Sequence, residues 1–234
     1  MPLSQASSQL VGEFIGTFLF VLTIPLASVG IGSLAPIPIA FMLMAMIFSF
    51  ADISGAHFNP ALTFSVFFLR RFTFGKFIRY VAVQVLAAIC ATFYGTAIVG
   101  LVFPAPSTNN DLMKIWQAFC AELVYTFALT TVFLHVAWSR AKNNELAAFS
   151  VGMTVLAAAF SVGGFTGGAF NPAVATGIQL VRCITGDCTP LIHIWLYWTA
   201  PIGGAIIAAT IYRLLDTEPL EDNGPSPNRI GDFH

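Results

Sequence analysis

A short phrase that is rich in hydrogen-bonding groups occurs twice in this apolar chain. Residues 54–62 read SGAHFNPAL, and residues 166–174 read TGGAFNPAV. In each copy an Asn precedes Pro, which is typical of a helix with Asn as its N-cap and Pro as its first residue, where the missing N–H costs nothing. The candidates for these two helix starts are Asn59, Pro60, Ala61, Asn171, Pro172 and Ala173.

The chemistry of this phrase is hydrogen bonding rather than bond making. Each helix start carries a partial positive charge and unpaired N–H groups, and the carboxamides of Asn59 and Asn171 can donate to a passing oxygen. Upstream backbone that is extended at membrane depth must line a cavity or be buried in protein, so its carbonyls can serve as acceptors. We expect this arrangement to repel cations and to pass small neutral solutes. The expected pore-lining backbone is Gly55, Ala56, His57, Phe58, Gly167, Gly168 and Ala169.

The chain that must hold these groups is too apolar for a soluble domain. Its 234 residues are 57% hydrophobic and 9% charged, and its mean hydropathy is +0.81. About 20 apolar residues suffice for one helix to cross a bilayer. We therefore predict an all-α membrane protein with six transmembrane helices, near residues 10–30, 36–50, 77–103, 113–137, 146–162 and 195–214.

Two further segments are predicted to be re-entrant half-helices. Polar residues from Asp52 onward interrupt the apolar run that ends at Phe50, and the apolar run that follows is too short to cross. The first half-helix is expected to extend from Asn59 to about Leu69. The second is expected to extend from Asn171 to about Leu180.

The two halves of the chain repeat one another. Glu13 and Glu122 lie in similar contexts, and each precedes its Asn-Pro-Ala by nearly the same distance. Three crossings per half place the halves in opposite orientations, which is an inverted repeat. We predict a single channel domain over 1–234, with repeats at about 10–103 and 113–214 and a flexible acidic tail at 215–234.

The distribution of basic residues predicts the orientation in the membrane. By the positive-inside rule, the side richer in Lys and Arg is cytoplasmic. Eight of the ten fall on one side, which places both termini in the cytoplasm; they are Arg70, Arg71, Lys76, Arg79, Arg140, Lys142, Arg213 and Arg229.

From about residue 10 to 214 the chain resembles the aquaporin, or major intrinsic protein, family. The motifs that carry the resemblance are the paired Asn-Pro-Ala, the Glu in the first helix of each half, Ser54-Gly55-Ala56-His57, and Tyr197-Trp198 with Pro201. The resemblance implies an aquaporin-like, right-handed bundle that forms a homotetramer with one pore per subunit. It also implies that Glu13 and Glu122 anchor the re-entrant loops by accepting hydrogen bonds from backbone N–H groups.

The chain departs from the family at the narrowest point of the pore. Family members usually carry Arg directly after the second Asn-Pro-Ala, and this chain has Val174. The constriction positions that the resemblance implies are Ile39, Ala159, Gly168 and Val174, none of which bears a charge or a ring. This set is similar to that of plant vacuolar-type members and predicts a wider, apolar constriction.

The predicted function is passive conduction of water and of small uncharged solutes such as urea, glycerol or ammonia, with ions and protons excluded. A strictly water-selective channel is one alternative, because glycerol-conducting members place an acid where this chain has Ala175, and Tyr197-Trp198 resembles the water-channel form. A junction-forming structural protein on the same fold is a second alternative. The partners are the bilayer and the solutes, and the host is a plasma membrane or an intracellular vacuole-type membrane. No cofactor, metal or nucleic acid is expected.

Several residues keep a second interpretation at this point. Asn59 and Asn171 can be simple helix caps, Glu13 and Glu122 can be ion-path carboxylates, and Asp52 can bond local backbone or contribute to gating. The pair Cys183 and Cys188 can be bonded or free. A coupled transporter, an ion channel and an intramembrane enzyme are disfavoured, because the chain has no further acids for coupling, no charged ring and no nucleophile placed with a base.

Overall fold

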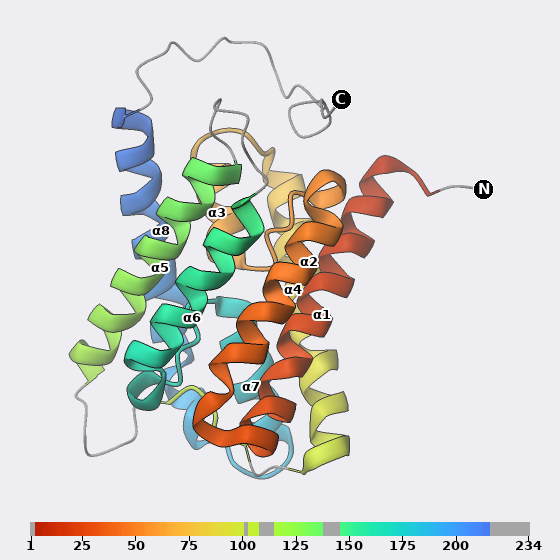
Figure 1. Ribbon diagram of the computed structural model, residues 1–234, viewed down its shortest axis with the longest axis vertical. Coiled ribbons are helices and arrows are strands. Elements are labelled where there is room, and N and C mark those ends of the chain that lie inside the picture. Colours follow the sequence, from red (N-terminus) through yellow and green to blue (C-terminus); the bar gives the residue numbers. More distant parts are fainter. Residues whose placement is uncertain (1–2, 101–102, 108–114, 138–145, 216–234) are drawn as a thin grey trace.

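The computed structural model describes residues 3–100, 103–107, 115–137 and 146–215, and within these ranges all regular structure is helical (Figure 1). Six helices are long and apolar enough to cross a membrane, which confirms the predicted fold class. They are α1 (Gln5–Ile31), α2 (Pro36–Ser54), α4 (Phe74–Val99), α5 (Ile115–Ala137), α6 (Ala147–Thr166) and α8 (Ile194–Leu215).

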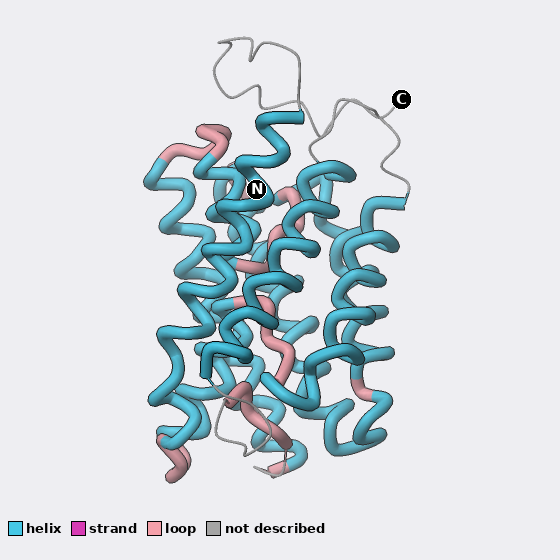
Figure 2. Tube along the Cα trace, turned by 90° about the vertical axis from the view of Figure 1, so that its left-hand side faces the viewer, coloured by secondary structure: helices cyan, strands magenta, loops and turns pink. Residues whose placement is uncertain are grey.

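Two short helices lie inside the bundle. They are α3 (Pro60–Phe68), of nine residues, and α7 (Pro172–Ile184), of 13 residues. They contact each other, and Figure 2 shows loop segments within the bundle, between the long helices, near its middle. Both are too short to cross a membrane, so they are half-helices that begin inside the protein.

The helix contacts follow the inverted repeat. Helix α1 packs on α4 as α5 packs on α8, and α3 contacts α8 as α7 contacts α4. Helices α2 and α6 pack on each other across the two halves. Helix α1 begins and α8 ends at the same end of the bundle (Figure 1), as an even number of crossings requires.

The helices before the two re-entrant loops are longer than predicted. Helix α2 continues past Phe50 to Ser54, so Asp52 lies in its last turns and is exposed, and α6 continues past Val162 to Thr166. Both end where a glycine takes a left-handed conformation, Gly55 with φ +86° and Gly167 with φ +81°. A glycine there caps a helix at little steric cost, so these two glycines determine the ends more strongly than the loss of hydrophobicity does.

Two other differences concern the ends of the half-helices and the connections. Helix α7 extends to Ile184, beyond the predicted end at Leu180, and a disulfide joins Cys183 in its last turn to Cys188 in the loop that follows. An ion pair joins the same two segments, with Nη2 of Arg182 in the last turn of α7 and Oδ2 of Asp187 in the loop 3.2 Å apart. The pairing that the sequence left open is therefore present in the structure.

Candidate pore and its lining

Glu13 holds the first re-entrant loop. It is fully buried in α1, and its carboxylate accepts hydrogen bonds from the backbone N–H groups of His57 (2.9 Å) and Phe58 (2.8 Å). It also accepts from the Ser54 hydroxyl and from the Gln84 side-chain amide, both at 2.8 Å. A buried carboxylate is costly unless several donors bond it. The same four hydrogen bonds also fix the backbone of the first re-entrant loop.

Glu122 has the same position in the second half. It is fully buried in α5 and accepts hydrogen bonds from the N–H groups of Ala169 (3.1 Å) and Phe170 (2.7 Å) and from the Thr166 hydroxyl (2.7 Å). Phe170 has a φ of +47°, and Phe58 in the first loop has +48°. Non-glycine residues rarely adopt this conformation, so the two carboxylates hold both loops in matching strained shapes.

Two tyrosines bond the residues at which the two re-entrant loops begin. The Tyr80 hydroxyl donates to the carbonyl oxygen of Ser54 (2.9 Å), and the Tyr197 hydroxyl donates to that of Thr166 (2.7 Å). Both side chains are almost completely buried. Sequence reasoning missed Tyr80, and it treated Tyr197 only as part of the Tyr197-Trp198 motif, with no contact assigned to its hydroxyl. The two tyrosines follow their Asn-Pro-Ala motifs at unequal spacings, so the repeat does not reveal them.

Replacing Tyr80 or Tyr197 with phenylalanine should destabilise the protein by about 1–2 kcal/mol, because one buried carbonyl oxygen loses its donor. The midpoint of thermal unfolding in detergent should fall by roughly 2–8 °C. Tyr94→Phe is the matched control, because Tyr94 lies in α4 with Tyr80 but is 57% exposed. Equal shifts for Tyr80→Phe and Tyr94→Phe would contradict the assigned support.

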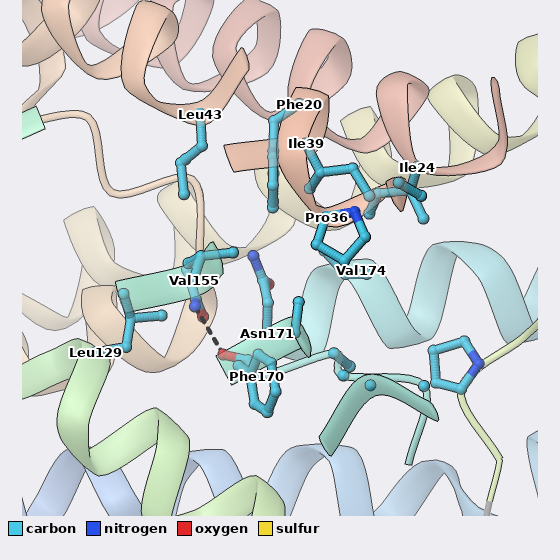
Figure 3. Close-up of a pocket in the computed structure, with 18 of the residues that line it drawn as sticks. Phe20, Ile24, Pro36, Ile39, Leu43, Leu129, Val155, Phe170, Asn171 and Val174 are labelled. Carbon is cyan, nitrogen blue, oxygen red and sulfur yellow. Dashed lines mark hydrogen bonds between the residues drawn. The ribbon is translucent and has the colours of Figure 1, made fainter. Parts of the chain in front are cut away.

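The two asparagines bond each other's loops. The Asn59 amide nitrogen donates to the carbonyl oxygen of Phe170 (2.9 Å), and the Asn171 amide nitrogen donates to that of Phe58 (2.8 Å; one such bond is drawn dashed in Figure 3). Each side-chain oxygen accepts from the N–H two residues ahead, Ala61 or Ala173. Because an amide nitrogen has two hydrogens, each Asn retains one for a solute.

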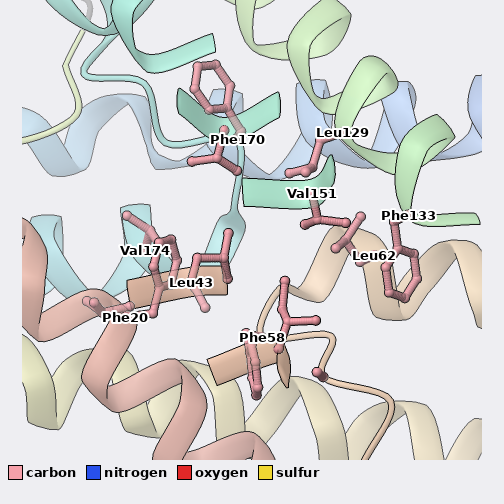
Figure 4. Close-up of a cluster of buried hydrophobic side chains, with 14 of the residues drawn as sticks. Phe20, Leu43, Phe58, Leu62, Leu129, Phe133, Val151, Phe170 and Val174 are labelled. Atoms are coloured by element: carbon pink, nitrogen blue, oxygen red, sulfur yellow. The ribbon is translucent and has the colours of Figure 1, made fainter. Parts of the chain in front are cut away.

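Both asparagines line a cavity of about 560 Å³, and Figure 3 shows Asn171 among the side chains of its wall. It extends from the last turns of α1 past Asn59 and Asn171 to Leu62 in α3. Among the described residues, no Asp, Glu, Lys or Arg lines it, and His57 is its titratable lining residue. Its polar lining groups are few, and apolar side chains such as Phe20, Leu43 and Val174 form most of the wall (Figure 3). The same three side chains belong to the buried hydrophobic cluster drawn in Figure 4.

Most residues that the sequence singles out lie at this cavity. All four constriction candidates line it, as do Asn59, Asn171 and six of the seven backbone candidates; the lining members are Ile39, Ala159, Gly168, Val174, Ala56, His57, Phe58, Gly167 and Ala169. Gly55, which caps α2, is not a lining residue, whereas Gly167, which caps α6, is one. The four Pro and Ala residues of the motifs are buried behind the asparagines in the first turns of α3 and α7.

His57 lies where the first loop meets the cavity. Its ring is 2% exposed and packs against Phe72 and Phe133, with centroids 5.2 and 5.3 Å apart. Its Nδ1 is 3.1 Å from the hydroxyl oxygen of Thr63. These contacts make His57 a packed residue whose edge borders the pore.

A membrane-spanning helical bundle with two half-helices that meet at a polar pair inside an apolar cavity is the architecture of a transmembrane channel. The chain belongs to the major intrinsic protein family, because the model of that family, "Major intrinsic protein", matches residues 3–212. This confirms the resemblance that the motifs indicate.

Individual relatives cover most of the chain. The "Probable aquaporin NIP5-1" of Arabidopsis thaliana is 34% identical over 229 residues, which is 93% of this chain and 72% of the relative. The "Glycerol uptake facilitator protein-like 6" of Lactiplantibacillus plantarum is 32% identical over 216 residues, 88% of this chain and 97% of the relative. The X-ray structure of the aquaglyceroporin from Plasmodium falciparum superposes with a TM-score of 0.76 at 22% identity, covering 90% and 96% of the two chains, and shows the shared fold.

Proposed function

We propose that this chain is a passive transmembrane channel for water and for small uncharged solutes such as urea, glycerol or ammonia, and that it excludes ions and protons. The observation that carries the solute range is the lining at the constriction positions. Ile39, Ala159, Gly168 and Val174 all border the cavity, and none of them brings a charge or an aromatic ring into it. Such a lining leaves more width than an arginine and rings would.

The exclusion of ions follows from the helix ends. The N-termini of α3 and α7 direct their partial positive charges toward the asparagine pair, and no acidic side chain lines the cavity to offset them. A cation would also lose most of its hydration in this apolar space, which is costly. A neutral solute meets neither of these two barriers. Passage of neutral solutes also agrees with the names of the relatives, which include an aquaporin and a glycerol uptake facilitator protein-like protein.

The assembly and orientation of the channel are also part of the proposal. A homotetramer with one pore per subunit is consistent with exposed apolar side chains that do not line the cavity, for example Phe48 and Trp116. The basic residues between α3 and α4 favour a cytoplasmic location for that end. Both termini would then be cytoplasmic, in a plasma membrane or a vacuole-type membrane.

The direct test is stopped-flow light scattering on proteoliposomes with gradients of an impermeant osmolyte, glycerol and urea. We expect water, glycerol and urea to cross faster than in protein-free vesicles, and we expect proton flux to stay at the protein-free level. Fast water with glycerol and urea at the background rate would instead indicate a strictly water-selective channel. Background rates for all three would favour a structural, junction-forming protein.

A further inference from the structure

Residues 103–107 form a further part of the cavity wall, and this part includes none of the four constriction positions. Pro104 and Pro106 line the cavity together with Gly167 of the second re-entrant loop. Pro106 and Gly167 are in direct apposition, because a Cβ atom on Gly167 would lie 2.5 Å from the Cα of Pro106. No side chain therefore separates this segment from the loop that carries Asn171.

This segment has no regular structure, yet it is held at both ends. Phe103 is 2% exposed and packs in the main hydrophobic core, and Ala105 packs against the same core. The carbonyl oxygen of Pro106 accepts a hydrogen bond of 2.7 Å from the side-chain amide of Gln179. Pro106 is consequently fixed relative to α7.

Gln179 is an unusual residue for its position. It is fully buried in α7, and its amide oxygen has no hydrogen-bond partner among the described residues. An unpaired buried acceptor costs free energy that an apolar side chain of similar size would avoid. Packing alone does not explain an amide there, whereas its bond to the Pro106 carbonyl does.

Helix α7 thereby joins two parts of the pore. Val174 lies in its first turn and Gln179 five residues later, roughly 7.5 Å along the helix axis. The same rigid element that presents the Val174 side chain to the cavity thus also sets the position of Pro106. Proline has no N–H, and the Pro106 carbonyl is bonded to Gln179, so the part of Pro106 left for the cavity is an apolar ring.

We infer that Pro106 is a specificity-determining residue of this channel, acting as a fifth wall of the constriction, and that Gln179 is the residue that positions it. The inference rests on the proposed passage of neutral solutes larger than water. Because Pro106 packs directly against Gly167, the two residues form one continuous part of the cavity wall, and a rigid ring in that wall limits the cross-section of the pore by its shape. Without the hydrogen bond from Gln179, the Pro106 ring would be able to move aside and let a wider solute pass.

The test uses the ratio of permeabilities to a four-carbon polyol and to glycerol, measured on the full chain in proteoliposomes. In Gln179→Leu, which keeps a large buried side chain and removes the donor, this ratio should rise about threefold or more, consistent with the loss of one buried hydrogen bond. Pro106→Ala should raise it similarly. The double variant should rise less than the product of the two, because both changes act on one wall.

A ratio of solutes separates selectivity from stability. A variant that only folded less well would lower both permeabilities together and leave their ratio unchanged. Thr176→Val is the matched control, because the Thr176 hydroxyl in α7 accepts from Trp198 of α8 (3.0 Å) and not from the 103–107 segment. We expect the wild-type ratio in this control.

The outcomes distinguish the inference from the function on which it rests. A wild-type channel that passes water alone would overturn the proposed solute range. A wild type that conducts glycerol, with an unchanged polyol ratio in both Gln179→Leu and Pro106→Ala, would overturn the roles assigned here. Should Gln179→Leu fail to fold, Pro106→Ala alone decides, since it leaves the tether in place.

Discussion

Glu13→Leu should abolish water permeability almost completely. The substitution removes the acceptor of four hydrogen bonds, two of them from the N–H groups of His57 and Phe58. Each buried donor left unpaired costs about 1–3 kcal/mol, so the total is comparable with the whole stability of a typical domain, about 5–15 kcal/mol. The loop that positions Asn59 would lose its fixed shape together with that stability.

The measurement is osmotic water permeability of proteoliposomes, normalised to the amount of folded protein, together with the unfolding temperature in detergent. Asp52→Asn is the control, because Asp52 is an exposed carboxylate at the end of α2 and should behave as wild type. Were Glu13 a carboxylate of an ion path, its removal would instead leave the fold and the water flux intact. That result would refute the anchoring role.

Glu122→Leu provides an internal comparison between the two halves. Glu122 accepts three hydrogen bonds and has no side-chain amide among its partners, in contrast to Glu13 with Gln84. Its replacement should therefore be severe but slightly less destabilising than that of Glu13. The order of the two unfolding temperatures follows directly from the numbers of donors.

The parts of the fold that the sequence predicts well depend on short-range signals. Hydrophobic runs indicate the crossings, and the Asn-Pro pairs indicate where α3 and α7 begin, because an N-cap and its first residue are adjacent in the chain. The ends of α2 and α6 were placed too early. Ser54 and Thr166 are polar but still helical, and the left-handed Gly55 and Gly167 end the helices.

The contacts that complete the site are long-range and leave no local pattern. Tyr80 bonds a residue 26 positions away, Gln84 bonds Glu13 over 71 positions, and Gln179 bonds Pro106 over 73. A buried polar residue in an apolar run was the available signal for each of them. A single sequence does not reveal which partner such a residue has, because many loop carbonyls are possible acceptors.

The site divides into parts with different tasks. The reciprocal bonds of Asn59 and Asn171 fix the two half-helices against each other, so the positive helix ends oppose cations whatever the width of the pore. We propose that the width of the pore is determined elsewhere, by Val174, which borders the cavity, and by its neighbours in the lining. Changes at Val174 should therefore alter which neutral solutes pass while leaving ion exclusion unchanged.

Val174→Arg should produce the largest change in selectivity. The side chain of Val174 is 3% exposed in the first turn of α7 and borders the cavity. Arginine brings a long side chain with five N–H donors into a cavity without acidic lining residues, where backbone carbonyls are its available partners. It narrows the pore and adds positive charge, so glycerol permeability should fall at least about tenfold, a barrier increase of about 1.4 kcal/mol.

Water is small enough to pass beside the new side chain, so its permeability should fall less than about threefold. Stopped-flow measurements with glycerol, urea and an impermeant osmolyte check this on one preparation. Val174→Leu separates volume from charge, because it enlarges the side chain without adding donors and should reduce glycerol permeability only modestly. Equal losses of water and glycerol in Val174→Arg would show that the variant blocks the pore, and unchanged permeabilities would show that residue 174 lies outside the narrowest point.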